Sequence, residues 1–199
     1  MANRNSAGFG LRPAGTLGNT PATQGLSQYW IDAGATVDLF HGMAMKSSGG
    51  YMITGESATT VTTIGVLQGI FYNAATTLKP TWASWYDATI TPANSEDTQA
   101  FVNDYPFQKY TIAADAQVAA SVPAAHVLFM ETYSVYANTG GNTTTGVSTT
   151  TLDIGATHAT THSWRLLRSA EDPENNDLTA AFCTLEVVQN LSEFVGTGT

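Results

Sequence analysis

The segment Thr60–Tyr72, TVTTIGVLQGIFY, places the tightest limit on how this chain can fold. It is rich in β-branched and aromatic residues, contains no charged residue, and is interrupted only by Gly65 and Gly69. Such residues favour strands, and a glycine inside a strand marks a bend or the close approach of another backbone. An uncharged strand of this length at a sheet edge would invite aggregation. We therefore expect the central strand of a small β-barrel or sandwich.

Segments of strand-like composition recur along the rest of the chain, at 29–31, 37–46, 51–54, 100–114, 116–136, 164–167 and 178–190. Gly49-Gly50 is typical of a hairpin turn, and Asn103–Pro106 is typical of a turn inside 100–114. A short helical turn is expected near Pro123. No segment keeps a helical period over three turns, so the predicted class is all-β.

Residues 1–28 are predicted to form an extended N-terminal arm, followed by one β-barrel-like domain over 29–190 and a tail over 191–199. The arm is rich in glycine and proline and cannot bury enough apolar surface to order by itself. Phe9, Leu11 and Leu17 are spaced like anchors on a partner, and the alternative is a disordered tail. Deletion of residues 1–20 is expected to leave the barrel folded.

The charge of the chain restricts its partners. Net charge is −9 and only 12% of residues are charged, compared with about 25% in an average domain. Few Lys and Arg residues argue against nucleic-acid binding, because phosphate contacts need them. Arg4 and Arg12 are the only charged residues in 1–31, so the arm is basic and the body acidic. A basic arm suggests contact with an acidic surface, unless the two arginines occur there by chance.

Cys183 is the single cysteine and lies in the apolar run AAFCTLEVV, which predicts a buried, unreactive thiol. The first ten residues lack the apolar core of a signal peptide. No stretch approaches the apolar length of a membrane-spanning helix. We expect a chain that is made in a cytoplasm and does not enter a membrane.

Three aromatic residues, Trp82, Trp85 and Tyr86, cluster within the loop-rich segment 73–99. Exposed aromatic side chains on a loop are typical of interface hot spots or of a platform for sugars. The same residues could also form a lid over the end of a barrel. The sequence leaves core or lid, interface and ligand platform open.

No motif for catalysis or for metal binding is present. His158 and His162 are four residues apart, which in an extended chain separates them by about 13 Å, and no HExxH pattern occurs. The acidic segment 170–177 lacks the spacing of a calcium loop and is predicted to be a solvated turn. Phosphate-loop and GxSxG motifs are absent. We expect no enzyme activity, no metal and no cofactor.

Several pieces of the chain, taken in order, resemble one family. They are ANRNSAGFGLRP (2–13), GVLQGIFY (65–72), AFVNDYPFQKYTI (100–112), the G-x-S-x-x-x-L-D element at Gly146–Asp153, and RLLRSAEDPENNDLTAAFCTLEVVQN (165–190). In this order they resemble the capsid decoration proteins of tailed bacteriophages, also called cement or head-stabilisation proteins. The resemblance covers most of the chain and is weakest over segment 73–99.

The resemblance implies a β-barrel or β-tulip-like protein on the outer capsid surface of a virion, made in the host cytoplasm. Its expected partners are the major capsid protein and other copies of itself, with a trimer favoured over a dimer. Neither nucleic acid nor a membrane is an expected partner. The residues expected to contact the capsid or a neighbour lie in the arm: Arg4, Phe9, Leu11, Arg12, Pro13 and Leu17. The candidate interface aromatics are Trp82, Trp85 and Tyr86.

Three other functions stay open at this stage. The chain could be a structural protein of the tail or neck. It could be a head-fibre or receptor-binding module that holds a glycan with Trp82, Trp85 and Tyr86, which would then be exposed around a polar cleft. A hydrolase is the third, and it would need close carboxylates in a concave site.

Overall fold

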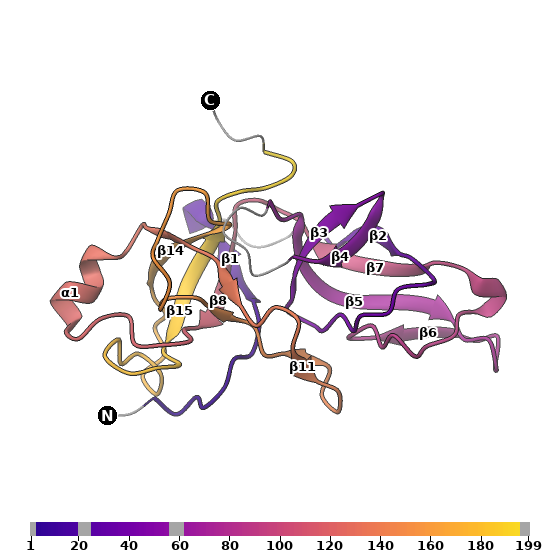
Figure 1. The fold of residues 1–199 in the computed structure, drawn as a ribbon, viewed down its shortest axis with the longest axis horizontal. Helices are drawn as coiled ribbons and strands as arrows, with labels where there is room; N and C mark the ends of the chain where they lie inside the picture. Colours follow the sequence, from indigo (N-terminus) through magenta and orange to yellow (C-terminus); the bar gives the residue numbers. More distant parts are fainter. Residues whose placement is uncertain (1–2, 20–24, 56–61, 196–199) are drawn as a thin grey trace.

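The computed structural model describes residues 3–19, 25–55 and 62–195. Its regular secondary structure is almost entirely antiparallel β, and its two larger sheets lie side by side along the long axis of the molecule (Figure 1). In spatial order, the five-stranded sheet contains β1 (Arg12–Thr16), β8 (Gln108–Ala113), β15 (Thr184–Gln189), β14 (Trp164–Ser169) and β9 (Thr132–Tyr133). The predicted all-β class is confirmed. The strands of the described residues form no closed barrel.

The six-stranded sheet has the order β2 (Ser27–Ile31), β7 (Thr98–Asn103), β5 (Gly65–Asn73), β3 (Ala44–Ser48) and β4 (Tyr51–Thr54), with β6 (Pro80–Ala83) beside β5. Two short ladders pair β10 (Val135–Tyr136) with β13 (Thr151–Leu152) and β11 (Gly141–Asn142) with β12 (Val147–Ser148). The helical elements are α1 (Val122–Val127), η1 (Leu17–Asn19) and η2 (Ala93–Ser95).

The predicted central strand is β5, and it begins at Gly65. Residues 62–64 precede it outside any strand, with only an isolated bridge between Thr63 and Ser192, and 60–61 lie outside the described residues. One edge of β5 pairs with β7, and the other pairs with β3 and β6. A Cβ added at Gly65 would overlap the carbonyl of Asn103, and one at Gly69 would overlap the ring of Trp82. Both glycines are therefore needed because neighbouring chain lies against them.

Other local predictions hold in part. The hairpin at Gly49-Gly50 is confirmed: Ser48 pairs with Tyr51, and the two glycines have φ values of 59° and 91°. The predicted strand 37–46 is present only from Ala44 onward, and segment 178–190 is strand only from Thr184. The helical turn predicted near Pro123 is α1, which has this proline in its first turn.

The buried apolar side chains form two clusters. One lies on the five-stranded sheet and includes Tyr110, Trp164 and Leu185. The other lies within the six-stranded sheet and includes Ile31, Leu67 and Ile70. Ala44 and Val66 belong to strands of the six-stranded sheet, yet they pack in the first cluster. The two cores therefore meet where β3 and β5 begin.

The chain enters the five-stranded sheet, leaves it and returns. β1 pairs with β8, and β2 to β7, which lie between them in the sequence, form the other sheet. The turn predicted at Asn103–Pro106 lies two residues later, where the N–H of Gln108 donates to the carbonyl of Tyr105 (3.0 Å), and it joins strands of two different sheets. The six-stranded sheet is thus an insertion between two neighbouring strands of the five-stranded one.

The predicted separate arm is wrong for residues 3–17. Leu11 is fully buried in the chain's own core, and β1 is the edge strand beside β8. Asn3 donates to the carbonyl of Ala181 (2.9 Å), and the backbone N–H of Asn5 donates to the side chain of Asn175 (2.6 Å). The glycine-rich sequence orders because the rest of the same chain supplies its partners, so deletion of residues 1–20 would remove part of the core and a strand.

The described part of the predicted C-terminal tail is also bound to the body. The N–H of Thr63 donates to Leu191 (3.2 Å), and the N–H of Glu193 donates back to Thr63 (3.0 Å). The Glu193 carboxylate accepts from the N–H of Ser47 (2.9 Å). Residues after β15 therefore connect the five-stranded sheet to β3, and 196–199 lie outside the described residues.

Asn138 is a buried amide at the junction of the two sheets, and it contacts both termini of the β3–β4 hairpin. Its Oδ1 accepts from the N–H of Ala44 (3.1 Å) and the hydroxyl of Thr150 (3.0 Å). Its Nδ2 donates to the carbonyls of Ala44 (2.9 Å) and Gly55 and to the hydroxyl of Thr54 (3.1 Å). This one side chain satisfies backbone groups that have no water available to them.

Ile70→Asp should abolish folding, because Ile70 is fully buried in the core of the six-stranded sheet and the new carboxylate would have no partner. Ile70→Val is the matched control and should cost only about 0.5–1.5 kcal/mol. Thermal unfolding followed by circular dichroism measures both. A native melting temperature for Ile70→Asp would contradict the central position of β5.

Asn138→Leu should lower the free energy of unfolding by about 2–4 kcal/mol, because the buried N–H of Ala44 and the carbonyl of Gly55 both lose the hydrogen bond that Asn138 makes. Thr54→Val removes one hydroxyl of the same network and keeps the bonds to Ala44 and Gly55, so its effect should be about 1 kcal/mol. Urea unfolding measures the difference. Equal losses in the two variants would show that the amide is not the main connection.

Candidate functional site

Alternation along the strands gives the six-stranded sheet one buried face and one exposed face. In register, Trp30 lies opposite Gln99, Gln99 opposite Phe71, and Phe71 opposite Trp82. One position along each strand, the neighbouring row of paired residues consists of Tyr29, Ala100, Ile70 and Ala83. The side chains of this row pack in or against the core. Side chains opposite one another on neighbouring strands share a face. The Trp30 row therefore lies on the outer face.

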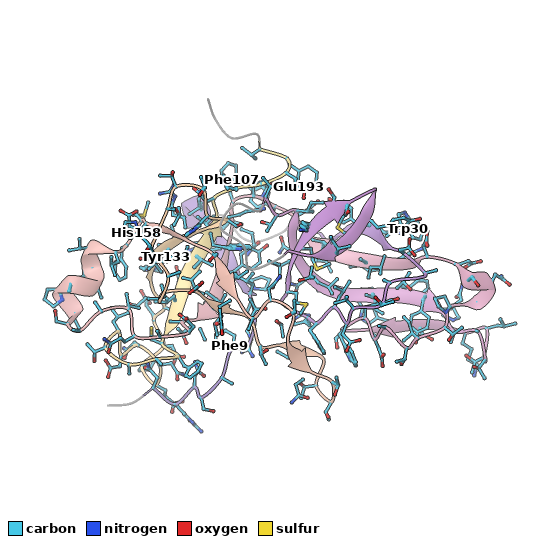
Figure 2. All side chains as sticks on the ribbon, viewed as in Figure 1. Phe9, Trp30, Phe107, Tyr133, His158 and Glu193 are labelled. Atoms are coloured by element: carbon cyan, nitrogen blue, oxygen red, sulfur yellow. The ribbon has the colours of Figure 1, made fainter. Side chains whose placement is uncertain are left out.

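Phe101 belongs to the same outer face. Its ring centroid is 4.7 Å from that of Trp82, whose indole lies over Gly69. Trp82 is 55% exposed and Trp30 is 44% exposed. We name Trp30, Phe71, Trp82 and Phe101 the aromatic face; Figure 2 shows Trp30 on the lobe that holds the six-stranded sheet.

The aromatic face has the composition of a binding surface. Gln28 pairs with Phe101 in register, and Gln99 lies between Trp30 and Phe71, so the side chains interspersed among the rings are uncharged. Exposed aromatic residues with few charges are typical of the central part of protein interfaces. A scattered exposed apolar side chain needs no explanation, but four rings on one sheet face indicate a docking surface.

An open pocket of about 540 Å³ adjoins one end of the aromatic face. Trp30 and Phe71 belong to the aromatic face and also line this pocket. The pocket is lined by Trp30, Gly49, Gly50, Tyr51, Phe71, Tyr72, Asn73, Pro92, Glu96, Asp97 and Gln99. It thus combines four aromatic residues with two carboxylates and two amides, brought together from β2, β5, β7, the β3–β4 hairpin and the segment that precedes β7.

Hydrogen bonds fix the Asp97 carboxylate in this pocket. The Tyr51 hydroxyl donates to one oxygen (3.1 Å) and the N–H of Ala33 donates to the other (3.0 Å). The bond to Asp97, together with its negative charge, raises the pKa of Tyr51 above its usual value. Tyr51 is therefore a protonated donor at neutral pH.

The predicted aromatic cluster is divided among three environments. Tyr86 is 1% exposed and belongs to the core, where burial raises its pKa. Trp85 stacks on Phe40 with ring centroids 5.0 Å apart. Only Trp82 reaches the aromatic face. A glycan platform made of these three residues together is therefore excluded by their positions.

Trp30, Phe71 and Phe101 were not among the predicted site residues. Their alternation with buried residues in SQYWI, GVLQGIFYN and TQAFVN could have assigned each to an outward position. It could not have shown that their strands are neighbours.

The residues expected in the arm have separate positions. Leu11 is in the core, Arg4 forms an ion pair with Glu174 (2.7 Å), and the Arg12 guanidinium lies 4.3 Å from the ring centroid of Phe9. Figure 2 places Phe9 beside the five-stranded sheet, away from Trp30.

Arg12, Pro13 and Leu17 are exposed on or next to the edge strand β1. Pro13 cannot donate a backbone hydrogen bond, and a bulge interrupts the pairing between Pro13 and Gly15. These features protect an edge from pairing with another strand. Contacts through β1 would therefore be made by side chains.

The candidate metal ligands are also apart. Nδ1 of His158 lies 3.3 Å from the carboxylate of Glu131, whereas His162 is buried with Nδ1 3.2 Å from the carbonyl of Thr132. Among residues 3–19, 25–55 and 62–195, no three His, Cys, Asp or Glu side chains are grouped as metal ligands. The acidic segment 170–177 is more than a solvated turn, since its buried Asn175 binds the N-terminal residue Asn5.

None of the helices in the described part of the chain has the length and apolar character needed to cross a bilayer. Comparison of the chain with protein-family models, with curated proteins and with solved structures finds no match in any of the three.

Cys183 is fully buried, as predicted, and burial raises its thiol pKa from 9.0 to about 12. A thiol reagent should react with it only after unfolding, which a colorimetric thiol assay with and without denaturant at about pH 8 will show. The pKa of the Cys183 thiol is higher in the folded than in the unfolded chain. Its contribution to the free energy of unfolding is therefore complete below pH 9 and is lost as the pH rises towards 12. Rapid labelling of the folded protein would contradict this burial.

Proposed function

We propose that this chain is a capsid decoration protein, which binds the outer surface of an assembled phage head and stabilises the contacts between major capsid subunits. The observation that carries the proposal is the aromatic face: two exposed tryptophans, Trp30 and Trp82, and the half-buried Phe71 and Phe101 on a hydrogen-bonded sheet, with glutamines and no charged residue among them. The order of the motifs that resemble decoration proteins supports it independently.

The aromatic face is suited to docking on a fixed lattice because its backbone is already ordered. Phe71 and Phe101 belong to β5 and β7, both of which are paired on two edges. Little conformational freedom would be lost on binding, so more of the interaction energy would remain as affinity. A face that binds the assembled lattice alone would stabilise it by mass action.

Several contacts per molecule would strengthen the attachment. Arg12, Pro13 and Leu17 are exposed on the other sheet, so a molecule with two lobes could touch two capsid subunits or a second copy of itself. Linked contacts of this kind raise the overall affinity above that of each one. Self-association as a trimer remains part of this proposal. The tail or neck assignment stays a prediction from the sequence.

In the direct test, the purified protein is mixed with empty expanded capsids and, separately, with unexpanded procapsids. Both particles are assembled from the major capsid protein of the same genome, and the protein that sediments with each is measured. We expect saturable binding to expanded capsids. Absence of binding to either form would contradict the proposed function.

A double variant, Trp30→Ser with Trp82→Ser, should weaken capsid binding about tenfold or more, with a melting temperature close to that of the native protein. The matched control is Val122→Ser with Val127→Ser, which removes two exposed apolar side chains on α1. Unchanged binding by the tryptophan variant, or equal losses in both variants, would show that the aromatic face is not the docking surface.

A further inference from the structure

We propose that the pocket beside the aromatic face receives one positively charged side chain, a lysine or an arginine, from the protein on which this chain docks. This inference rests on the proposed function and identifies the chemistry of the partner. It is carried by the meeting of Glu96 and Asp97 with the aromatic residues Trp30, Tyr51 and Phe71 in one pocket.

The charge of the pocket selects a cation. Glu96 and Asp97 line it, and no lysine, arginine or histidine is among its described lining residues. Asp32 adds a further negative charge close enough to act on Tyr51. Lys79, the residue immediately before β6, does not line the pocket. A bound ammonium or guanidinium group would supply the missing positive charge.

The rings add a second attraction for the same kind of group. The face of an aromatic ring is electronegative and attracts a cation, most strongly in tryptophan. Trp30 is 44% exposed and is therefore accessible to a side chain that enters from solvent. A guanidinium can stack on such a ring while its edge binds a carboxylate.

The Asp97 carboxylate is already oriented for this contact. The Tyr51 hydroxyl and the Ala33 N–H each donate to a different oxygen (3.1 and 3.0 Å), which holds the group in place and leaves lone pairs for a further donor. The Glu96 carboxylate is exposed and accepts a long bond from Asn94 (3.4 Å), so it can adjust its position. One fixed and one adjustable acceptor suit a side chain with several N–H donors.

Neighbouring surfaces explain why the cation should belong to a protein. The rest of the aromatic face carries no charge among its four rings, so a partner lying across it would be apolar there and would place its basic residue at the pocket. A neutral sugar would fit the rings and the amides of Asn73 and Gln99, but it would leave both carboxylates without a counter-charge. Charge complementarity therefore favours the basic side chain.

The test uses the whole protein and small probes, so it does not depend on capsids. N-acetyl-arginine amide and N-acetyl-lysine amide are titrated while the Trp30 indole N–H resonance is followed by NMR; uncharged N-acetyl-norleucine amide, acidic N-acetyl-glutamate amide and a panel of neutral oligosaccharides are the comparison ligands. We expect saturable shifts with the two basic probes alone, weakened at high salt.

Glu96→Gln should weaken binding of the basic probes several-fold, and the double variant Glu96→Gln with Asp97→Asn should weaken their binding further. Because Asp97 also binds Tyr51 and Ala33, the single Glu96 variant keeps the test valid if the double variant folds poorly. The matched control is Glu171→Gln with Asp172→Asn, an acidic pair in a different pocket beside β1. It should bind the probes like the native protein.

Three results would overturn the inference: equal binding of the norleucine probe, stronger binding of a neutral oligosaccharide, or basic probes that bind Glu96→Gln and the double variant as well as the native protein. Probe binding without capsid binding would refute the decoration function and leave the cation pocket standing. Capsid binding that is lost in the tryptophan variant but unchanged in Glu96→Gln, with no probe binding, would refute only the pocket.

Discussion

The arrangement of this molecule depends on the hydrogen bonds of the buried amide of Asn138. A buried backbone group without a partner is costly, and here one side chain satisfies both polar groups of Ala44 and the carbonyl of Gly55. Ala44 begins β3 and Gly55 follows β4, so the amide fixes both ends of the hairpin that carries Tyr51. The position of one wall of the pocket therefore follows from an interaction at the junction of the two sheets.

Because one sheet is inserted between two strands of the other, the two sheets are joined by several connections. β1 and β8 are neighbours in the five-stranded sheet, and everything between them in the sequence forms the second lobe. The segment after β15 adds another connection, through Leu191 and Glu193 to Thr63 and Ser47. Forces applied to the aromatic face would thus reach the core of the other lobe through several covalent and hydrogen-bonded routes. Such continuity would suit the proposed binding to a capsid lattice.

An exposed apolar sheet face carries a risk of unspecific association, and the surroundings of the aromatic face reduce it. Gln99 separates Trp30 from Phe71, and Glu96 and Asp97 lie at one end. With a net charge of −9, copies of the chain repel one another at a distance. The acidic pocket would also favour one orientation of a partner over others, because charge complementarity contributes more to specificity and association rate than to affinity.

The sequence by itself determined the all-β class, the central strand β5 with its two close-packed glycines, the Gly49-Gly50 hairpin and the burial of Cys183. Each of these follows from local composition, because alternation, turn chemistry and apolar runs act over a few residues. Only the tertiary structure decided that β7 and β8 enter different sheets, that Leu11 lies in the core, and that Trp82 joins Trp30, Phe71 and Phe101 rather than Trp85 and Tyr86. Alternation tells which residues of one strand share a face, but strand neighbours are chosen by contacts between distant residues. The aromatic face and its pocket are products of that choice.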